Sequence, residues 1–326
     1  MSSSDRFLDE APERGPNDDE LMEAEQIRTL MRDLLRRGHT QRQLANEVGT
    51  PQSVLSQWLQ GKWQAAWNTQ HYKLRMWQQH RLEGQTLAPN EPVWVDTTTG
   101  QEIRNALTFA QLEPSISIVY GAAGVGKTTA IRRYQSEGRN VWSVTGSPTK
   151  RALEPALLAV AAALGLRGLN GGADQLSRDI AGRMYGSRGL LIFDEAQHLF
   201  EPALEELRSI HDACGVGVCL AGNEQVYSNL TGGGHRGAAF AQLFSRVGLR
   251  LHLPAPTRED VDAVIDAWGV KGHQELQFLR MLGEAEGGLR LLNQVLRSAS
   301  REAEASGAAV TIDLLRAASR GVGARL

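Results

Sequence analysis

A glycine-rich segment at residues 121–128 carries the clearest chemical signal in the chain. It reads Gly-Ala-Ala-Gly-Val-Gly-Lys-Thr and matches the pattern G-x-x-x-x-G-K-[ST] in full. In this pattern the glycines let backbone N–H groups turn toward phosphates, the lysine reaches the β- and γ-phosphates, and the hydroxyl binds Mg²⁺. We therefore predict a nucleoside triphosphate site, whose binding residues are Gly121, Gly124, Gly126, Lys127, Thr128 and Thr129.

Two adjacent carboxylates follow an apolar run at residues 190–193. Four apolar residues in succession are typical of a strand that is buried on both faces. We predict that Asp194 binds Mg²⁺ through water, and that Glu195 orients and deprotonates the attacking water, as is usual in hydrolytic NTPases. His198 follows shortly afterwards and is interpreted as a capping or packing residue rather than a base.

Three further polar residues complete the predicted chemistry. Asn223 stands at the tip of an expected strand, where it can hydrogen-bond the attacking water or the γ-phosphate; the alternative is an ordinary turn asparagine. Arg246 precedes another expected strand and can project from a subunit edge toward a neighbour's γ-phosphate. Arg290 begins an expected helix and can sense the nucleotide of its own subunit. For each arginine the alternative is a surface salt bridge.

Short apolar runs alternate with helical periodicity through the middle of the chain, and each run ends in a polar or glycine-rich turn. This alternation predicts a parallel α/β sheet. A helix expected at 129–135 follows the glycine-rich segment and directs its N-terminus at the phosphates. After Pro254 and Pro256 the pattern is helical to the end, beginning with Thr257. The strands are expected at 115–120, 141–145, 190–193, 216–221 and 248–253.

Charge is distributed unevenly along the chain. Residues 1–20 carry seven acids and two bases, whereas residues 26–83 carry nine bases and three acids, a balance of 9 − 3 = +6. Because the two segments largely cancel, the net charge of -2 does not exclude a polyanionic partner. We interpret residues 1–20 as a disordered acidic tail that competes with a polyanion for the basic segment.

The basic segment contains a helix-turn-helix pattern at residues 41–58. Ala45 is small where two helices cross, Gly49 supplies the turn, and the shared core is expected to hold Val48, Leu55 and Trp58. The second helix then presents to DNA the polar residues Gln52, Ser53, Ser56 and Gln57. The alternative is a small helical bundle with a polar face. Three tryptophans near the end of the segment are interpreted as packing residues: Trp63, Trp67 and Trp77.

Composition limits the class of protein. The 326 residues include 41% hydrophobic residues, enough for buried cores, but no apolar run approaches the ~18 residues of a membrane span. Two cysteines without a second pair argue against a zinc cage and against structural disulfides. We expect a cytoplasmic protein with an acidic tail at 1–20, a helix-turn-helix DNA-binding domain at 21–83, a linker at 84–100, a nucleotide-binding core at 101–254 and a C-terminal helical domain at 255–326.

The chain resembles the AAA+ ATPases in its motifs and in their order: the phosphate loop, the Asp-Glu strand, the strand-tip asparagine and the two arginines. Further runs are similar to the bacteriophage Mu transposition protein B family; they lie at 140–142, 194–199, 205–208, 223–233 and 240–246. The similarity extends from the helix-turn-helix to the C-terminal helices and omits the acidic tail. It implies an α/β AAA+ P-loop domain with a parallel sheet flanked by helices, an N-terminal all-α helix-turn-helix domain and a C-terminal helical lid domain.

The resemblance also implies a function. Members of this family bind double-stranded DNA with ATP and without marked sequence preference, assemble as helical filaments, and deliver target DNA to a DDE-type transposase that they stimulate; hydrolysis disassembles the filament. ATP and Mg²⁺ are the implied ligands, and the cytoplasm of a bacterial host is the implied location. The ATPase roles argued above are carried over to Lys127, Thr128, Asp194, Glu195, Asn223, Arg246 and Arg290.

DNA contacts on the ATPase core are expected at basic residues near its loops. Lys150 and Arg151 follow the second strand, the edge from which related AAA+ proteins project DNA-contacting loops. Arg178 and Arg183 lie on the helix before the Asp-Glu strand, and Arg236 lies in a glycine-rich segment. Each is alternatively a solvated charge. Two other functions stay open: an ATP-switched helix-turn-helix transcription regulator, and a helicase loader.

Overall fold

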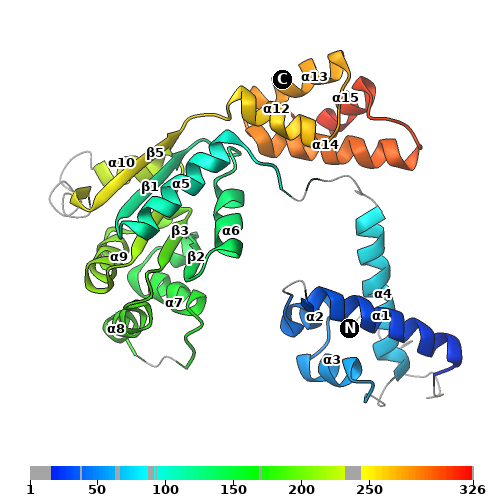
Figure 1. Ribbon diagram of the computed structural model, residues 1–326, viewed down its shortest axis with the longest axis horizontal. Coiled ribbons are helices and arrows are strands. Elements are labelled where there is room, and N and C mark those ends of the chain that lie inside the picture. The colour runs from blue at the N-terminus through cyan, green and yellow to red at the C-terminus, as the bar shows by residue number, and fades with distance from the viewer. Residues whose placement is uncertain are drawn as a thin grey trace, which may run out of the picture. The chain divides into compact units, whose positions relative to one another are not determined.

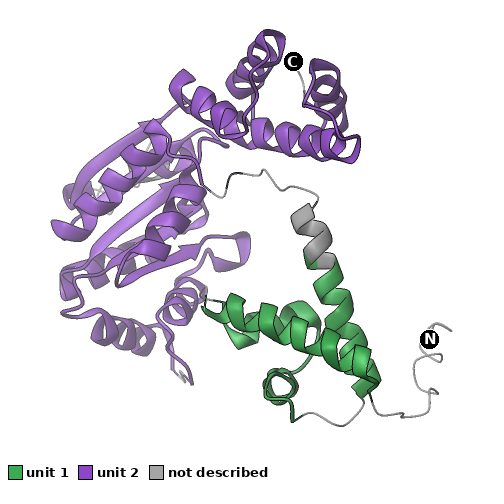
Figure 2. Ribbon diagram, turned by 45° about the vertical axis from the view of Figure 1, so that its right-hand side comes forward, with its two compact units in different colours: residues 1–89 green, residues 90–326 purple. Residues whose placement is uncertain are grey.

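The computed structural model describes residues 16–36, 39–62, 67–86, 92, 94–168, 171–231 and 244–324. The chain divides into two compact units, residues 1–89 and 90–326 (Figure 2). The division falls within the segment expected as a linker, 84–100. Trp63, Arg236 and most of the expected acidic tail lie outside the described residues.

Unit 1 is made of helices that share one core. They are α1 (Asp18–Arg36), α2 (Gln41–Val48), α3 (Gln52–Leu59) and α4 (Trp67–Thr86) (Figure 1). The core contains the three residues expected there, Val48, Leu55 and Trp58, together with side chains from α1 and α4. Trp67 and Trp77 are also buried, which confirms that they pack inside the unit.

Local capping fixes both ends of α2. The Thr40 hydroxyl accepts a hydrogen bond from the Gln43 N–H at 3.2 Å, and Gln43 Oε1 accepts one from the Thr40 N–H at 2.8 Å. At the other end Gly49 takes the left-handed conformation, with φ +71°, and its N–H bonds to the carbonyls of Ala45 and Asn46. The turn between α2 and α3 therefore lies at the glycine where the sequence predicts it.

Helix α1 begins inside the segment expected as a tail. Asn17 Oδ1 accepts from the N–H of Glu20, and Glu20 Oε2 accepts from the N–H of Asn17, both at 2.8 Å. Asp18 and Asp19 add negative charge to the first turn, where the helix dipole is positive. The helix therefore takes up the last residues of the predicted tail, and their acids stabilise its N-terminus.

Unit 2 contains a parallel five-stranded sheet in the order β2-β3-β4-β1-β5. Every predicted strand is present, displaced by one residue at most at either end. The prediction of a parallel α/β sheet is confirmed (Figure 1). The strands are β1 (Ile116–Gly121), β2 (Val141–Thr145), β3 (Leu190–Asp194), β4 (Gly217–Gly222) and β5 (Val247–Leu253).

Helices cover both faces of this sheet. One face packs against α5 (Thr98–Leu112) and α6 (Lys127–Glu137), and the other against α7 (Leu153–Ala163), α8 (Ala173–Met184) and α9 (Glu201–Cys214). In β3, Leu190 and Ile192 join the first core while Leu191 and Phe193 join the second. Because alternate side chains of a strand point to opposite faces, this double burial explains the uninterrupted apolar run. Shorter elements lie at the strand ends: η1 (Pro148–Lys150), η2 (Ala196–His198) and α10 (Glu224–Thr231).

The chain after β5 is helical, as predicted. The helices are α12 (Arg258–Ala267), α13 (His273–Glu284), α14 (Gly288–Ala305) and α15 (Ile312–Gly321), and they enclose a separate apolar core. Thr257 begins α12 with a capping box to Asp260. Within the ranges that the structure describes, no helix is both long and apolar enough to span a bilayer.

A buried carboxylate, that of Asp260, connects the C-terminal helices to α5, which packs on one face of the sheet. Asp260 has no exposed surface and accepts hydrogen bonds from the N–H of Thr99 (3.0 Å), the Thr99 hydroxyl and the N–H of Thr257 (3.0 Å). It therefore serves the N-termini of both α5 and α12. Burial raises the pKa of Asp260, but the hydrogen bonds from Thr99 and Thr257 outweigh it and hold the pKa below its ordinary value.

We expect Asp260→Asn to destabilise unit 2 by about 2 to 3 kcal/mol, because a neutral carboxamide has one acceptor oxygen instead of two. Since the folded-state pKa of Asp260 is lowered, its contribution is complete above the ordinary aspartate pKa of about 3.9 and is lost as the pH falls through the folded value. Thermal unfolding of the wild type and of Asp260→Asn should show a smaller difference in the free energy of unfolding at about pH 3 than at about pH 7. Asp262→Asn, which breaks a partly exposed pair with Arg280, is the control. An equal loss in both variants contradicts the prediction.

Candidate functional site

The phosphate loop connects β1 to α6, and its lysine is held inside it. Lys127 Nζ donates to the carbonyls of Gly121 at 2.9 Å and Ala122 at 2.8 Å, and the side chain is buried. Burial lowers the pKa of this ammonium group, an effect that the charges of Asp194 and Glu195 partly oppose. An anion bound in the loop would offset the desolvation, so the arrangement favours a polyphosphate.

Two of the predicted glycines are required by close approach of other backbone. A Cβ on Gly121 would lie 2.0 Å from the carbonyl oxygen of Leu253 in β5. A Cβ on Gly124 would lie 1.9 Å from that of Gly287, which precedes α14, and both glycines have positive φ. Gly126 is the N-cap of α6. The loop is therefore packed between the edge strand and the C-terminal helices.

Thr128 and Asp194 meet beside the lysine. The Thr128 hydroxyl donates to Asp194 Oδ2 at 2.7 Å, and Asp194 is buried at the end of β3. Hydroxyl and carboxylate oxygens are the hard ligands that Mg²⁺ prefers, and the ion commonly completes its shell with water and substrate phosphates. Among the described residues no group of three or more His, Cys, Asp or Glu side chains forms a metal site by itself. The pair fits a magnesium ion that arrives with a nucleotide.

Glu195 follows β3 in the left-handed backbone conformation, with φ +57° and ψ +38°. For a residue other than glycine this costs about 1 to 3 kcal/mol and persists only where the surroundings impose it, often at functional sites. The N–H of Glu195 donates to Asp194 Oδ1 at 3.0 Å. Its carboxylate accepts a hydrogen bond from the side-chain amide of Gln197 on η2, a residue that lies in the run 194–199 but to which sequence reasoning gave no role.

Asn223 stands at the end of β4, as the sequence predicts. Its Oδ1 accepts from the N–H of Gln225 at 3.0 Å and so serves the turn that begins α10. The residue also lines the nucleotide cavity described below. The two interpretations of Asn223 are therefore compatible, since the oxygen serves the turn while the amide nitrogen can donate to a ligand.

A cavity of about 650 Å³ brings most of the predicted residues together. From the loop, the strand ends and α14 it is lined by Gly121, Gly124, Gly126, Lys127, Thr128, Thr129, Glu195, Asn223 and Arg290. The remaining wall comes from a segment expected as linker, including Trp94, Val95 and Thr97, and from Val264 and Leu289 of the C-terminal helices. Sequence reasoning missed this wall because the segment has no helical or strand periodicity.

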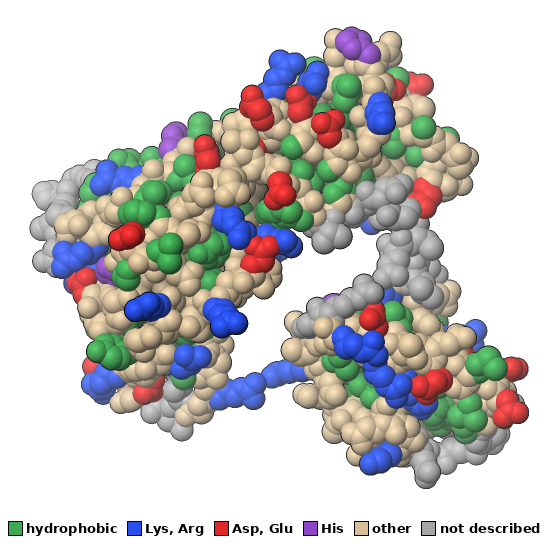
Figure 3. All heavy atoms as spheres, in the orientation of Figure 1, with side chains coloured by type: hydrophobic (Ala, Val, Ile, Leu, Met, Phe, Trp, Pro, Cys, Tyr) green, Lys and Arg blue, Asp and Glu red, His purple; other side chains and the backbone are tan. Residues whose placement is uncertain are grey.

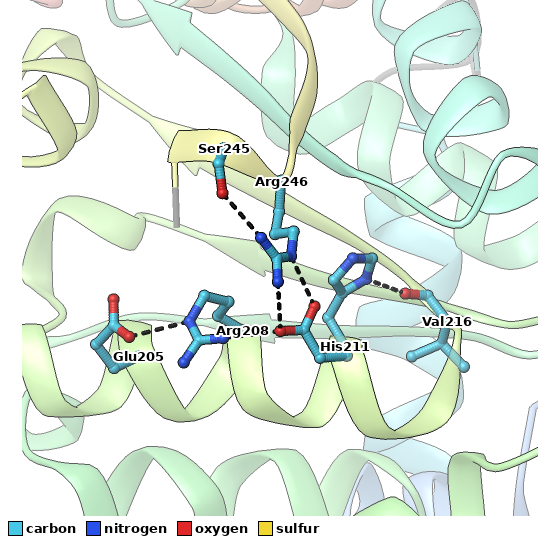
Figure 4. A network of polar contacts seen from close by, with 7 residues as sticks. Glu205, Arg208, His211, Val216, Ser245 and Arg246 are labelled. Atoms are coloured by element: carbon cyan, nitrogen blue, oxygen red, sulfur yellow. Dashed lines mark hydrogen bonds and ion pairs between the residues drawn. The ribbon is translucent and has the colours of Figure 1, made fainter. Parts of the chain in front are cut away.

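Arg246 lies apart from the cavity. Its carbonyl accepts from the N–H of Ile116, where β1 begins, whereas the phosphate loop follows the other end of β1. Its Nε lies 3.0 Å from Asp212 Oδ1 on α9, and its Nη1 donates to Ser245 at 2.9 Å (Figure 4). Arg208 binds the same carboxylate at 2.7 Å. Within its own subunit Arg246 is thus a salt-bridge residue at the end of the sheet remote from the loop.

Two basic residues expected to contact DNA lie near the end of β2. Lys150 Nζ donates to the carbonyl of Thr145 at 3.0 Å. The Arg151 guanidinium lies 4.4 Å from the centre of the Phe200 ring, a cation–π contact. Both side chains contact their own chain, so they offer a fixed rather than a freely moving charge.

The other basic residues expected to contact DNA are on α8 or outside the described part. Arg178 pairs with Asp174 at 2.6 Å, and the Arg183 guanidinium lies 5.6 Å from the Trp142 ring centre. Arg236 lies outside the described residues. On the face seen in Figure 3, Lys and Arg side chains are interspersed with Asp and Glu.

On unit 1 the polar face of α3 is accessible. Gln52, Ser53 and Gln57 are exposed, and Ser56 is half-buried. No contact in the structure assigns them to DNA, so their role in base or phosphate recognition stays a prediction.

Part of the positive charge of unit 1 serves the fold. Arg28 Nε donates to the carbonyl of Trp58 at 3.0 Å, and Arg32 Nη2 to that of Leu59 at 3.2 Å. These carbonyls belong to the last turn of α3, where a cation is favoured. Two further arginines bind glutamates, in the pairs Arg75–Glu23 and Arg81–Glu47. The excess of +6 counted from the sequence therefore overstates the charge that is open to a polyanion.

Comparison with known proteins places the chain in a family. The family described as Mu B transposition protein, C terminal, matches residues 245–322, and the AAA domain family matches residues 111–230. The chain is 36% identical over 300 residues to the ATP-dependent target DNA activator B of Escherichia phage Mu, which covers 92% of this chain and 96% of that protein. The chain belongs to the Mu B transposition protein family. The predicted AAA domain and the predicted family are confirmed.

Further similarities cover most of the chain. The ATP-dependent target DNA activator B of Escherichia phage D108 is 36% identical over 300 residues, covering 92% of this chain and 96% of that protein. The Mu-like prophage FluMu DNA transposition protein B of Haemophilus influenzae is 36% identical over 256 residues, with 78% and 89% covered. Among solved structures, domain III of the replication initiation protein DnaA of Thermotoga maritima is similar at 15% identity and a TM-score of 0.47, with 73% and 96% covered.

Proposed function

We propose that this member of the Mu B transposition protein family is a Mg²⁺-dependent ATPase that binds double-stranded DNA, assembles on it as a helical filament and delivers target DNA to a DDE-type transposase that it stimulates. Relatives that match nearly the whole chain are named ATP-dependent target DNA activator B, which supports ATP and target DNA as ligands. Hydrolysis disassembles the filament and makes the choice of target reversible.

The cavity supports the ATPase part of this proposal. Lys127 and the backbone N–H groups around Gly124 and Gly126 bind phosphates, while the apolar end near Trp94 and Leu289 suits a nucleoside. Mg²⁺ held near Thr128 and Asp194 would neutralise charge on the phosphates. Glu195 accepts the proton of the attacking water, and Asn223 and Arg290 contact the γ-phosphate side of the nucleotide.

The position of Arg246 supports assembly. Five residue steps of β1, from Ile116 beside Arg246 to Gly121 at the phosphate loop, span about 16 Å at ~3.3 Å per step, which is longer than an arginine side chain. Arg246 is therefore assigned to the nucleotide of a neighbouring subunit, where it stabilises charge on the transferred phosphoryl group. Such a head-to-tail contact generates an open helical filament when the rotation between subunits does not close.

DNA binding is assigned to exposed polar and basic groups on both units. On unit 1 these are three residues of α3, Gln52, Ser53 and Gln57, and on unit 2 they are the half-buried Lys150 and the exposed Arg151. Contacts that go mainly to phosphates give sequence-tolerant binding that weakens with salt. The acidic tail is proposed to compete for the same positive charge.

Mixing two inactive variants tests this assignment. Glu195→Gln keeps nucleotide binding but lacks the proposed base, and Arg246→Ala lacks the arginine offered to a neighbour, so each alone should hydrolyse ATP poorly in the presence of DNA. In an equal mixture, about one interface in four pairs an intact Glu195 with an intact Arg246, and ATPase activity should return to about that fraction of wild type. Phosphate release from mixtures at fixed total protein measures it.

A double variant, Glu195→Gln with Arg246→Ala, is the control for this mixing. It should not restore activity to either single variant, because every interface would still lack one of the two groups. If the mixture of single variants stays as inactive as its components, the assignment of Arg246 to a neighbouring site is wrong.

A further inference from the structure

Gln197 connects the ends of two neighbouring strands at the nucleotide cavity. It lies on η2, directly after β3, and its Nε2 donates to Glu195 Oε2. Its Oε1 accepts from the backbone N–H of Asn223, after β4, at 3.3 Å. One side-chain amide thus contacts both the proposed base and the strand tip that carries the proposed γ-phosphate contact.

Gly222 of β4 leaves room for this amide. A Cβ on Gly222 would lie 2.1 Å from Gln197 Oε1, so a larger residue there would require the Gln197 side chain to move from its observed position. On the β3 side, a Cβ on Gly146 would lie 2.5 Å from the carbonyl oxygen of Glu195, and the N–H of Gly146 donates to the backbone carbonyl of Asp194 at 2.7 Å. The backbone of Glu195 is therefore closely packed, and the amide of Gln197 is held by its two hydrogen bonds.

The carboxylate of Glu195 needs a partner that fixes its orientation. Its backbone is set by the left-handed conformation, but rotation about the side-chain bonds is free unless a partner fixes the carboxylate. Gln197 binds Oε2 and leaves Oε1 to accept a hydrogen bond from a water molecule. A general base must lie within hydrogen-bond reach of the proton it takes, and a misplacement of about 1 Å can reduce a rate about 100-fold.

The geometry points to Gln197 as a positioning residue for hydrolysis. Its amide holds the Glu195 carboxylate in a fixed position relative to Asn223, so that the proposed base and the proposed γ-phosphate contact stay at a constant distance from each other. This inference rests on the proposed ATPase function. Gln197 acts through Glu195 and is not assigned a contact with the nucleotide or the water.

Two isosteric variants separate positioning from packing. Gln197→Glu keeps the volume and the acceptor for the Asn223 N–H but loses the donor to Glu195, and Gln197→Met keeps the volume and loses both. We expect kcat for ATP hydrolysis to fall about 10- to 100-fold in both, with KM changed less than about twofold, because nucleotide binding does not depend on Gln197. His198→Ala, on the same short helix, is the matched control and should keep the wild-type rate.

A double-variant comparison shows whether Gln197 acts through Glu195. In a Glu195→Gln background, adding Gln197→Met should change the single-turnover rate less than about twofold, because the carboxylate that Gln197 positions is gone. A readout without hydrolysis is the ¹⁵N spectrum of the nucleotide-free protein, in which the Gln197 side-chain resonances should move on Glu195→Ala and stay in place in His198→Ala.

The outcomes are distinct. A wild-type protein without ATPase activity refutes the proposed function. An active wild type with near-wild-type rates in Gln197→Glu and Gln197→Met refutes the positioning role alone. A rate increase in these variants also refutes it, since Gln197 would then hold Glu195 in an unproductive position. If adding Gln197→Met to Glu195→Gln lowers the single-turnover rate as much as it does in the wild type, Gln197 does not act through Glu195, and the positioning role is refuted.

Discussion

Lys127→Ala is expected to abolish nucleotide-dependent assembly on DNA. The ammonium group donates to two loop carbonyls and is a buried cation of the phosphate loop. Bound ATP would offer phosphate oxygens to this ammonium group, and their negative charge would offset the cost of burying Lys127. Loss of two charge-assisted hydrogen bonds, each worth about 1.5 to 3 kcal/mol, should weaken ATP binding at least about 100-fold.

Binding of a fluorescent ATP analogue and co-sedimentation with duplex DNA measure the two consequences of Lys127→Ala. Arg132→Ala is the matched control, because it removes one positive charge from the exposed face of the same helix. Equal unfolding temperatures of the two variants would show that the loss is local. Filaments of Lys127→Ala that still form only with ATP would refute the assignment of residues 121–128 as the phosphate loop.

The phosphate end of the site follows from sequence because its residues are close along the chain. The loop from Gly121 to Thr128 and the pair Asp194–Glu195 each lie within one turn, and each follows a strand recognisable from its apolar run. Parallel strands then bring these turns to the same edge of the sheet. The five predicted strands are off by one residue at most. The central strands β3 and β4 are buried along their whole length and so leave an apolar pattern, whereas the edge strand β5 alternates half-buried and exposed residues over most of its length.

The rest of the site depends on contacts between distant segments. Trp94 and Val95 were assigned to a linker because their segment has no periodicity, yet they line the cavity with Leu289, nearly two hundred residues away in the chain. Gln197 becomes informative only when β4 is placed beside β3 and Gly222 leaves room for it. A single sequence shows residue types and spacings but not these juxtapositions.

The charge of unit 1 shows a related limit. Counting bases predicted a positive surface, but a count does not distinguish an arginine that faces solvent from one that satisfies a helix end. Arg28 and Arg32 bind the last carbonyls of α3, which makes them part of the fold that presents Gln52 and Gln57. Their replacement is therefore unsuitable as a test of DNA contact, whereas α3 side chains are exposed and can be exchanged.

Contacts within unit 2 connect the C-terminal helices to the nucleotide. Gly287 touches the phosphate loop at Gly124, Arg290 lines the cavity, and Asp260 holds α12 against the N-terminus of α5. A nucleotide that fills the cavity must therefore contact or displace the start of α14. The bundle from α12 to α15 therefore borders both the phosphate loop and the cavity.

Glu195→Gln is expected to trap the ATP-bound assembly on DNA. Glutamine has nearly the same size as glutamate, and its side-chain oxygen can still accept the hydrogen bond from Gln197, so the cavity should keep its shape. It cannot take a proton from water, and loss of a general base typically reduces a rate by about 10² to 10⁴. Nucleotide binding should be retained, because Glu195 makes none of the contacts assigned to phosphate binding.

The lifetime of the DNA complex measures this second effect. After ATP is diluted, wild-type complexes should dissociate as hydrolysis proceeds, while Glu195→Gln complexes should persist for at least about 100 times longer. Glu201→Gln, in the first turn of α9 and outside the cavity, is the matched control and should dissociate like wild type. Equal lifetimes for wild type and Glu195→Gln, with hydrolysis blocked in the variant, would mean that disassembly does not depend on hydrolysis. The long lifetime of the Glu195→Gln complexes should also be lost when Lys127→Ala is added. Such a result would connect the two predictions, because the state that holds the protein on DNA would then be the one with unhydrolysed ATP in the phosphate loop.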